Sequence, residues 1–400
     1  MENHNTQVNA QDTRRYDLDW LRIIAFGLLI LYHVGMFYVS WGWHVKSPHA
    51  GPFAEPAMML LNPWRMPLLF LISGVAIIFA AEKMGLRTLS WKRTVRLFVP
   101  LVFGMLFIVA PQSYFELLAK GEIQAGYLEF YQIYVSGHEG YSVTVPTWNH
   151  LWYLVYLITY SLIVLPFVPA INWLGEKMDT PGFERLMSGG RIFLIPAALF
   201  VTYRFTTDIW FPEHTHALVD DWGAHARYFS YFIVGMLIAK NTAFWRVLAA
   251  TWRTGLVLVL VSAAILLPMW VNWENWTGNQ WFVDIIRAWR VIYAWAVIAT
   301  VMGVAQHYLN RPSKRLSYLT EAVFPYYILH QTLIVVIGVA AASLALPAAI
   351  EFLVVLAGTV LGCLLLHEYI IRRTVFLRPL FGLPLKPKQR QSADKLQPAE

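Results

Sequence analysis

The sequence predicts an all-α integral membrane protein with about ten transmembrane helices and both termini in the cytoplasm. Of the 400 residues, 58% are hydrophobic and only 14% are charged, whereas a soluble domain carries about a quarter charged residues. Apolar windows of roughly 20 residues, the length that crosses a bilayer, recur along the chain. Lys and Arg gather in alternate connections between these windows, as the positive-inside rule requires of cytoplasmic loops.

The predicted spans follow one another with mostly short connections. Pro63 and Pro67 in the second span and Pro325 in the ninth are expected to kink their helices or to free a carbonyl for another use. The spans are 20–40, 57–80, 95–112, 149–169, 191–207, 226–240, 254–273, 284–307, 321–342 and 349–371.

The basic residues set the orientation of these spans. Five of them lie between positions 83 and 96 and three between 311 and 315, whereas the opposite connections hold little beyond Lys46 and Lys120. Cytoplasmic termini at both ends require an even number of spans, which agrees with ten. We therefore predict a cytoplasmic segment 1–19, a transmembrane domain 20–371 and a basic, disordered cytoplasmic tail 372–400. The single cysteine excludes a disulfide framework.

Ionisable residues inside the spans are candidate functional residues, because burying each of them in hydrocarbon costs at least a few kcal/mol. Asp19, Arg22 and His33 share one face of the first helix, with Arg22 and His33 about 16 Å apart along its axis. A packing helix with paired charges is the alternative. The predicted depth in the membrane divides the polar residues of the spans into an inner and an outer group. The inner group is Asp19, Arg22, Arg93, Arg96 and Glu321, with Ser73 and Gly74 further along their span; the outer group is His33, Asn62, Arg65, His150, Arg204, Arg227, Arg287 and Arg290.

This many cations in the outer half predict a water-filled or substrate-filled cavity that faces outward. His330 lies near mid-depth on the ninth helix, and Tyr326 and Tyr327 lie one turn before it on the same side, able to fix its tautomer or to pack beneath it. The outside connection 113–148 is rich in aromatic and acidic residues, which suit sugar rings and hydroxyls but also form interfacial aromatic belts.

Other ligand patterns are weak. The loop with His214, His216, Asp220, Asp221 and His225 lacks fourfold metal-ligand spacing, so we predict a solvated loop and no metal site. The segment HEYII at 367–371 lacks the second His of a zinc protease helix. No glycine-rich phosphate loop is present, and the basic balance reflects membrane topology, not nucleic-acid binding.

Five motifs, in order along nearly the whole chain, resemble those of the membrane acyltransferase-3 family. An Arg and a His with ten residues between them occur in YDLDWLRIIAFGLLILYH (16–33), and a Ser-Gly pair occurs in FLISG (70–74). The other three are KRTVR (92–96), HLWYL (150–154) and PYYILHQ (325–331). WHVKS (43–47) and WRMPLLFLISG (64–74) resemble, more loosely, the branch of the family that acts on periplasmic glucans.

The resemblance implies transfer of an acyl group, acetyl or succinyl, from cytoplasmic acyl-coenzyme A (acyl-CoA) to a hydroxyl of an extracytoplasmic glycan. It implies acyl-CoA as a co-substrate, no permanently bound cofactor and, in bacteria, the inner membrane. The oligomeric state is left open. A secondary transporter for a small anion is the alternative, because charged midspan residues and proline-broken helices also describe carriers. Against a carrier stands the absence of a detectable inverted repeat.

The residues make physical sense of such a reaction. His33 is the predicted general base, because an imidazole with a pKa of about 6.5 is suited to take a proton from a hydroxyl. Arg22, Arg93, Arg96 and Ser73 are predicted to bind the acyl donor, since guanidinium groups bind phosphates bidentately. Topological anchoring is the alternative for the Arg93–Arg96 pair, and helix packing for Ser73 with Gly74. Asp19, Arg65, His150, Tyr327 and His330 are predicted to line the site or contact the acceptor, with satisfied packing histidines as the alternative for His150 and His330.

Overall fold

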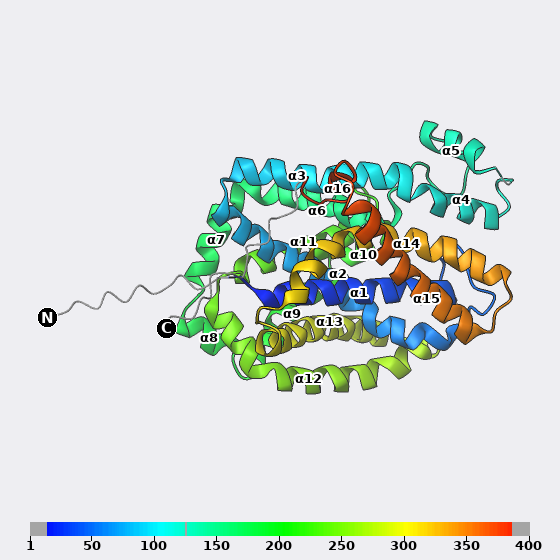
Figure 1. Ribbon diagram of the computed structural model, residues 1–400. Helices are drawn as coiled ribbons and strands as arrows, with labels where there is room; N and C mark the ends of the chain where they lie inside the picture. Colours follow the sequence, from blue (N-terminus) through cyan, green and yellow to red (C-terminus); the bar gives the residue numbers. More distant parts are fainter. Residues whose placement is uncertain (1–13, 125, 386–400) are drawn as a thin grey trace, which may run out of the picture. The chain divides into compact units, whose positions relative to one another are not determined.

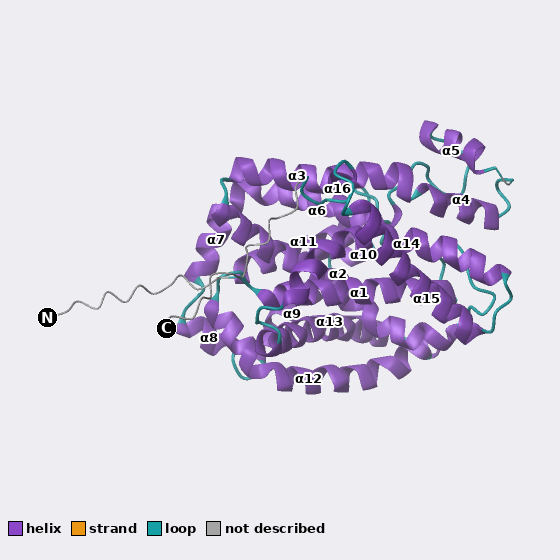
Figure 2. Cartoon of the chain, in the orientation of Figure 1, coloured by secondary structure: helices purple, strands orange, loops and turns teal. Residues whose placement is uncertain are grey.

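The computed structural model describes residues 14–124 and 126–385, and these residues fold into helices joined by loops (Figures 1 and 2). In this part of the chain the strand-like feature is an isolated antiparallel bridge between His138 and Val145. Nine helices of the described residues are long and apolar enough to cross a membrane. The all-α polytopic membrane fold predicted from the sequence is therefore confirmed.

Each predicted span coincides with a helix or a run of helices. The sixth span is α11 (Trp222–Ile238), whose 17 residues reach only the lower limit of about 17 to 25 residues for a crossing helix, so it is not among the nine. The other spans correspond to α1 (Tyr16–Tyr38), α2 (Glu55–Lys83), α3 (Leu86–Phe103) with η2 (Gly104–Ile108) and α4 (Ala110–Ala119), α6 (Trp152–Val164), α9 (Arg191–Arg204), α12 (Thr242–Val271), α13 (Gln280–Tyr308), α14 (Lys314–Ser343), and α15 (Ala348–Leu365) with η6 (Leu366–Ile371).

The short helices were not predicted, because none of them is long enough to stand out as an apolar window of membrane length. Local signals do explain some of them: Thr180 accepts a hydrogen bond from the Phe183 amide at 3.2 Å, and Pro181 occupies the first position of the helix that follows. These elements are α5 (Tyr127–Ser136), α7 (Val168–Lys177), α8 (Pro181–Met187), α10 (Thr207–Trp210), α16 (Leu377–Leu380), η1 (Pro52–Ala54), η3 (Asn149–Leu151), η4 (Leu165–Phe167) and η5 (Trp273–Asn275).

The chain divides into two compact units, each built from segments that are distant in sequence. Unit 1 consists of 1–29, 56–83 and 166–320, and unit 2 consists of 30–55, 84–165 and 321–400. The predicted transmembrane domain 20–371 is therefore an interleaved pair of units, and α1 and α14 each contribute to both.

Unit 1 has a core in which α13 packs against α9 and α12. Trp295 is fully buried there and donates its indole N–H to the Ile192 carbonyl at 2.8 Å. Helices α2 and α11 approach closely through glycine, since a Cβ on Gly74 would lie 2.0 Å from the Phe232 carbonyl oxygen. Within α2, which continues through both of its internal prolines, the Leu60 carbonyl also accepts the hydroxyl of Tyr293 at 3.1 Å.

Unit 2 has two apolar clusters. The first joins the end of α1 to α14 and α15 through residues such as Phe37, Ile334 and Val355. The second lies under the predicted outside connection and contains Tyr114 and Tyr134. The start of the predicted cytoplasmic tail packs within unit 2, whereas residues 386–400, for which disorder was predicted, lie outside the described residues.

Candidate active site

Two histidines from distant parts of the sequence meet in unit 2. His33 lies on α1 and is half-buried, whereas His330 lies on α14 and is fully buried. The Nδ1 atom of His33 is 2.8 Å from the Nε2 atom of His330. The two rings therefore share one hydrogen bond, and the roles of their nitrogens follow from the remaining partners.

The backbone of α14 sets the protonation of this pair. The Nδ1–H of His330 donates to the Tyr327 carbonyl at 2.7 Å and to the Tyr326 carbonyl at 3.2 Å. Its Nε2 must therefore accept, so the shared proton resides on Nδ1 of His33. This assignment from the hydrogen-bond network makes Nε2 the basic nitrogen of His33. The two tyrosines fix the tautomer through their carbonyls, not through their hydroxyls.

His150 is buried beside this pair but has a different role. Its Nε2–H donates to the Ile328 carbonyl at 3.1 Å, and its Nδ1 accepts from the Gln112 amide at 3.4 Å. The Tyr327 hydroxyl donates to the His150 carbonyl at 2.6 Å. Because both ring nitrogens of His150 are engaged within the protein, the geometry favours His150 as a residue that holds the site together.

An amide network extends from His150 toward the outside connection. The Gln112 carbonyl oxygen accepts from Gln331 at 3.0 Å and from Asn149 at 3.1 Å. Gln331 also donates to Nε2 of His44 at 2.9 Å, and Nδ1–H of His44 donates to the carboxylate of Glu116. Buried amides whose donors and acceptors are satisfied rigidify a site, so this network fixes α4, α14 and the His44 loop relative to one another within unit 2.

Sequence reasoning missed this network. Gln112 is fully buried and Gln331 nearly so, yet the candidate residues inside the spans included only one amide, Asn62. The available signal was the presence of uncharged amides in apolar windows, because hydrocarbon penalises any polar group without a partner. Gln331 directly follows His330 and closes the PYYILHQ motif, which places it beside the predicted site in sequence.

The predicted donor-binding arginines of unit 2 lie on one face of α3. Arg93 donates to the Ser161 hydroxyl at 2.7 Å, and Arg96 donates to the Gly382 carbonyl at 3.1 Å. Neither of these contacts is with a carboxylate. The oxygens in these two contacts are neutral, and guanidinium groups also bind phosphates, the ligand predicted for this pair.

The other predicted site residues belong to unit 1. Asp19 accepts hydrogen bonds from Arg22 at 3.3 Å and from Arg14 at 2.7 Å, so its carboxylate is engaged in ion pairs. Arg65 is buried in α2. The predicted convergence of Arg65 with His150 and His330 stays a prediction.

Ser73 lies where α2 meets α11. Its neighbour Gly74 allows the Phe232 backbone to approach, and Gly235 on α11 allows the Leu71 carbonyl to approach in the same way, with 2.0 Å to a notional Cβ in each case. This reciprocal contact is helix packing through small residues, the alternative to donor binding at this motif. Donor binding by Ser73 stays a prediction.

The outside connection is organised by packing. Tyr114 and Tyr134 are buried, and the Tyr134 hydroxyl donates to the Met105 carbonyl at 2.7 Å. Burial raises the pKa of Tyr134 to about 12, which keeps its hydroxyl protonated. Lys46, on the outside loop that follows α1, caps this helix by donating to the Met36 and Val39 carbonyls at 2.7 Å each. Burial lowers the pKa of Lys46, and the charge of Glu55 opposes that shift.

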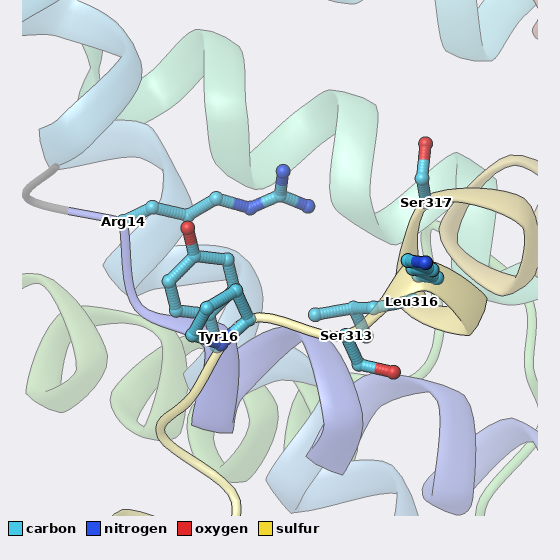
Figure 3. A pocket seen from close by; sticks show the side chains of 7 residues that line it. Arg14, Tyr16, Ser313, Leu316 and Ser317 are labelled. Carbon is cyan, nitrogen blue, oxygen red and sulfur yellow. The ribbon is translucent and has the colours of Figure 1, made fainter. Parts of the chain in front are cut away.

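Two further observations concern possible ligand sites, one a pocket and the other the arrangement of metal-ligating side chains. A pocket of about 370 Å³ in unit 1 holds none of the predicted site residues (Figure 3). Within residues 14–124 and 126–385, no group of three or more His, Cys, Asp and Glu side chains could hold a metal ion. The lining of the pocket is Arg14, Tyr16, Pro312, Ser313, Lys314, Leu316 and Ser317.

The multi-pass helical fold fits a family of membrane enzymes. The family model described as "Acyltransferase domain", Acyl_transf_3, matches residues 15–368, and the chain belongs to this acyltransferase family. It is therefore a membrane acyltransferase of the class that transfers groups other than aminoacyl groups, which confirms the predicted resemblance.

Individual relatives of the chain share one name. The chain is 24% identical to the glucans biosynthesis protein C of Escherichia coli O6:K15:H31 (strain 536 / UPEC) over 339 residues, covering 81% of this chain and 83% of the relative. The same identity and coverage hold for that protein from strains O139:H28 (E24377A / ETEC) and O9:H4 (HS). No solved structure matches the chain.

Proposed function

We propose that this acyltransferase moves an acetyl or succinyl group from cytoplasmic acyl-CoA to a hydroxyl of an extracytoplasmic glycan or glycoconjugate. The observation that carries the proposal is the hydrogen bond that makes Nε2 the basic nitrogen of His33. The name of the relatives, glucans biosynthesis protein C, supports a glycan as the acceptor.

The proposed reaction needs one base. His33 Nε2 removes the proton of the acceptor hydroxyl while the hydroxyl oxygen attacks the thioester carbonyl. The new C–O bond forms, the C–S bond breaks, and the proton passes from Nε2 to the departing thiolate of coenzyme A. His330 is the positioning residue, because its Nε2 accepts from His33 Nδ1 and so holds the ring in the required tautomer.

The donor is proposed to bind from the cytoplasm. Arg93 and Arg96 contact the phosphates of coenzyme A, with Arg22 as a further cation on the donor side. The bilayer that holds the protein is then the bacterial inner membrane, where acyl-CoA is available on one side and glycans on the other.

The test is a transfer assay with the full chain purified into lipid nanodiscs. Acetyl-CoA and succinyl-CoA are supplied separately with a periplasmic glucan fraction, free thiol is measured, and the glucan mass is determined by mass spectrometry. We expect thiol release that depends on the glucan and a matching increase in its mass. Thiol release without a mass gain would leave only a hydrolase, and no release from the folded protein with either donor would overturn the proposal.

A further inference from the structure

Unit 1 contains a cluster of charged residues that the transfer reaction does not use. Its centre is Asp208 on α10, whose side chain is 5% exposed. Arg204 on α9 donates to this carboxylate at 3.0 Å, and Arg227 on α11 donates to both of its oxygens at 2.9 and 3.1 Å. Two guanidinium groups thus share one buried carboxylate. The charges of Arg65, Arg290 and the buried Asp221 act on Tyr228 together with that of Arg227, so the arginines around the cluster outnumber the carboxylates.

The surrounding residues add to this excess. Arg287 on α13 is half-buried and stacks on Trp273 at 5.8 Å, and within the described residues it forms no ion pair. The charges of Arg204 and Asp208 act on it, as does that of Asp284 one turn earlier, whose carboxylate accepts from Gln280. Arg287 is therefore a third cation beside the cluster, and Asp284 adds a further carboxylate.

Two histidines in the loop between α10 and α11 lie in the same positive field. Nε2 of His214 lies 3.0 Å from Arg227, and His214 is exposed to solvent. The crowding of protein around His214 and the charge of Arg227 lower its pKa to about 4. The ring therefore stays neutral and accepts from Arg227. The surrounding protein likewise lowers the pKa of His216 although this residue is exposed; the charge of Asp221 opposes that shift and the charge of Arg65 adds to it.

The balance of charges indicates whether such a cluster is only structural or also binds a ligand. Buried guanidinium groups are costly unless anions compensate them, and a purely structural network would match its cations with carboxylates. The buried Nε of Arg204 also finds no hydrogen-bond acceptor among the described residues. Guanidinium groups that outnumber their carboxylates are suited to an oxyanion, which they bind with short, charge-assisted hydrogen bonds.

We infer that Arg204, Arg227 and Arg287 form an anion-binding site that accepts the carboxylate or phosphate group of a small extracytoplasmic ligand. The three arginines lie in the ends of spans 191–207, 226–240 and 284–307 that the distribution of Lys and Arg predicts to be outer, and they belong to unit 1, whereas the histidine pair belongs to unit 2. It does not require the acyl-transfer proposal, because anion binding is measured without an acyl donor.

Binding is tested on the full chain in nanodiscs with three probes that share one ring: glucuronate, glucose 6-phosphate and neutral glucose. Isothermal titration is performed at constant ionic strength set with sodium chloride. We expect one of the two anionic sugars, or both, to bind and to raise the unfolding temperature, and we expect glucose to do neither. Preference for glucuronate assigns a carboxylate ligand, and preference for glucose 6-phosphate assigns a phosphate ligand.

The principal variant is Arg287→Gln, because this residue forms no ion pair that the fold would lose. We expect it to weaken binding of the anionic probe about tenfold or more, and Arg204→Gln to weaken it similarly if that variant folds. The matched control is Arg253→Gln, an exposed arginine of unit 1 that also stacks on a tryptophan, Trp252, at 4.8 Å. Equal binding by Arg287→Gln and Arg253→Gln, or no binding of either anion to the folded wild type, would overturn the inference.

Discussion

At the scale of single residues, the tautomer of His33 is the feature with the clearest chemical consequence. A histidine acts as a base only through the nitrogen that lacks a proton, and the partner of the other nitrogen decides which one that is. In this protein that partner is His330, held in turn by the Tyr327 carbonyl. The backbone of α14, one turn from Pro325, therefore selects which nitrogen of His33 is basic.

Replacing His33 with Ala is expected to lower transfer about 10²- to 10⁴-fold, because the general base is lost. Membrane insertion should be unchanged, since the hydrogen bond that His33 shares with His330 is worth only about 1 kcal/mol. Thiol release in nanodiscs measures the effect. The matched control is His138→Ala, an exposed histidine of unit 2, which should retain wild-type turnover. Full activity of His33→Ala would remove the base from the mechanism.

Arg93→Ala and Arg96→Ala are expected to raise the dissociation constant for acyl-CoA about tenfold or more each, because a charge-assisted contact to phosphate is lost. Lys at either position should restore only part of the affinity, since an ammonium cannot form a bidentate fork. Fluorescent acyl-CoA binding provides the measurement, with Arg87→Ala as an exposed control on the same helix. If affinity is unchanged in both variants, the pair is only a topological anchor.

At the scale of elements, the ends and contacts of α1 and α2 position the site residues. The last turn of α1 lies just beyond His33, and its carbonyls lack partners within the helix. Lys46 supplies those partners from the following loop. Helix α2 is held against α11 by a backbone contact that only glycine permits.

Lys46→Met is expected to destabilise the protein by about 1 kcal/mol or more, because the carbonyls of Met36 and Val39 lose their donor. Activity should fall with it, since the end of α1 frays close to His33. Hydrogen exchange of peptides covering 30–40 detects the fraying, and Lys120→Met, an exposed lysine of unit 2, provides the control. Unchanged exchange in Lys46→Met would show that the cap is dispensable.

Gly74→Val is expected to lower the yield of folded protein severely, because a Cβ would lie 2.0 Å from the Phe232 carbonyl oxygen and backbone must move. Gly27→Ala is the matched control on α1, where a Cβ would meet no atom within 4 Å. Size-exclusion profiles and unfolding temperatures of the two variants are compared. Wild-type stability in Gly74→Val would show that α2 and α11 separate without penalty.

At the scale of the whole molecule, the number of crossings depends on α11. Nine helices of the described residues meet the requirements of length and hydropathy, and α11 is a single short helix between two of them. Cytoplasmic termini at both ends require α11 to cross the membrane as well, giving ten. Its 17 residues suffice for a thin or locally compressed bilayer.

We predict that both Ser392 and Arg14 face the cytoplasm and that Thr215 faces outside. Cysteines introduced one at a time at these positions are labelled in intact cells with an impermeant maleimide, and the native Cys363 provides a low background because it is fully buried. Only Thr215→Cys should react before the cells are opened. Labelling of Ser392→Cys in intact cells would mean that α11 does not cross and that the count is nine.

The membrane fold and its spans could be predicted from the sequence, because the bilayer imposes length and hydropathy on each helix independently of its neighbours. The candidate base could also be identified, since an ionisable residue inside an apolar span is costly and conspicuous. The amide network of Gln112 and Gln331 could not, because an uncharged amide gives a weak signal until its partners are known.

The tertiary structure alone decided how these residues combine. His33 and His330 are separated by 297 positions, and no local rule fixes the distance or hydrogen bonding between side chains so far apart in sequence. The same holds for Arg204 and Arg227, which meet at Asp208 from different helices, and for Lys46, which caps α1 from the following loop. Sequence determines which side chains are costly to bury, whereas only packing determines which partners compensate that cost.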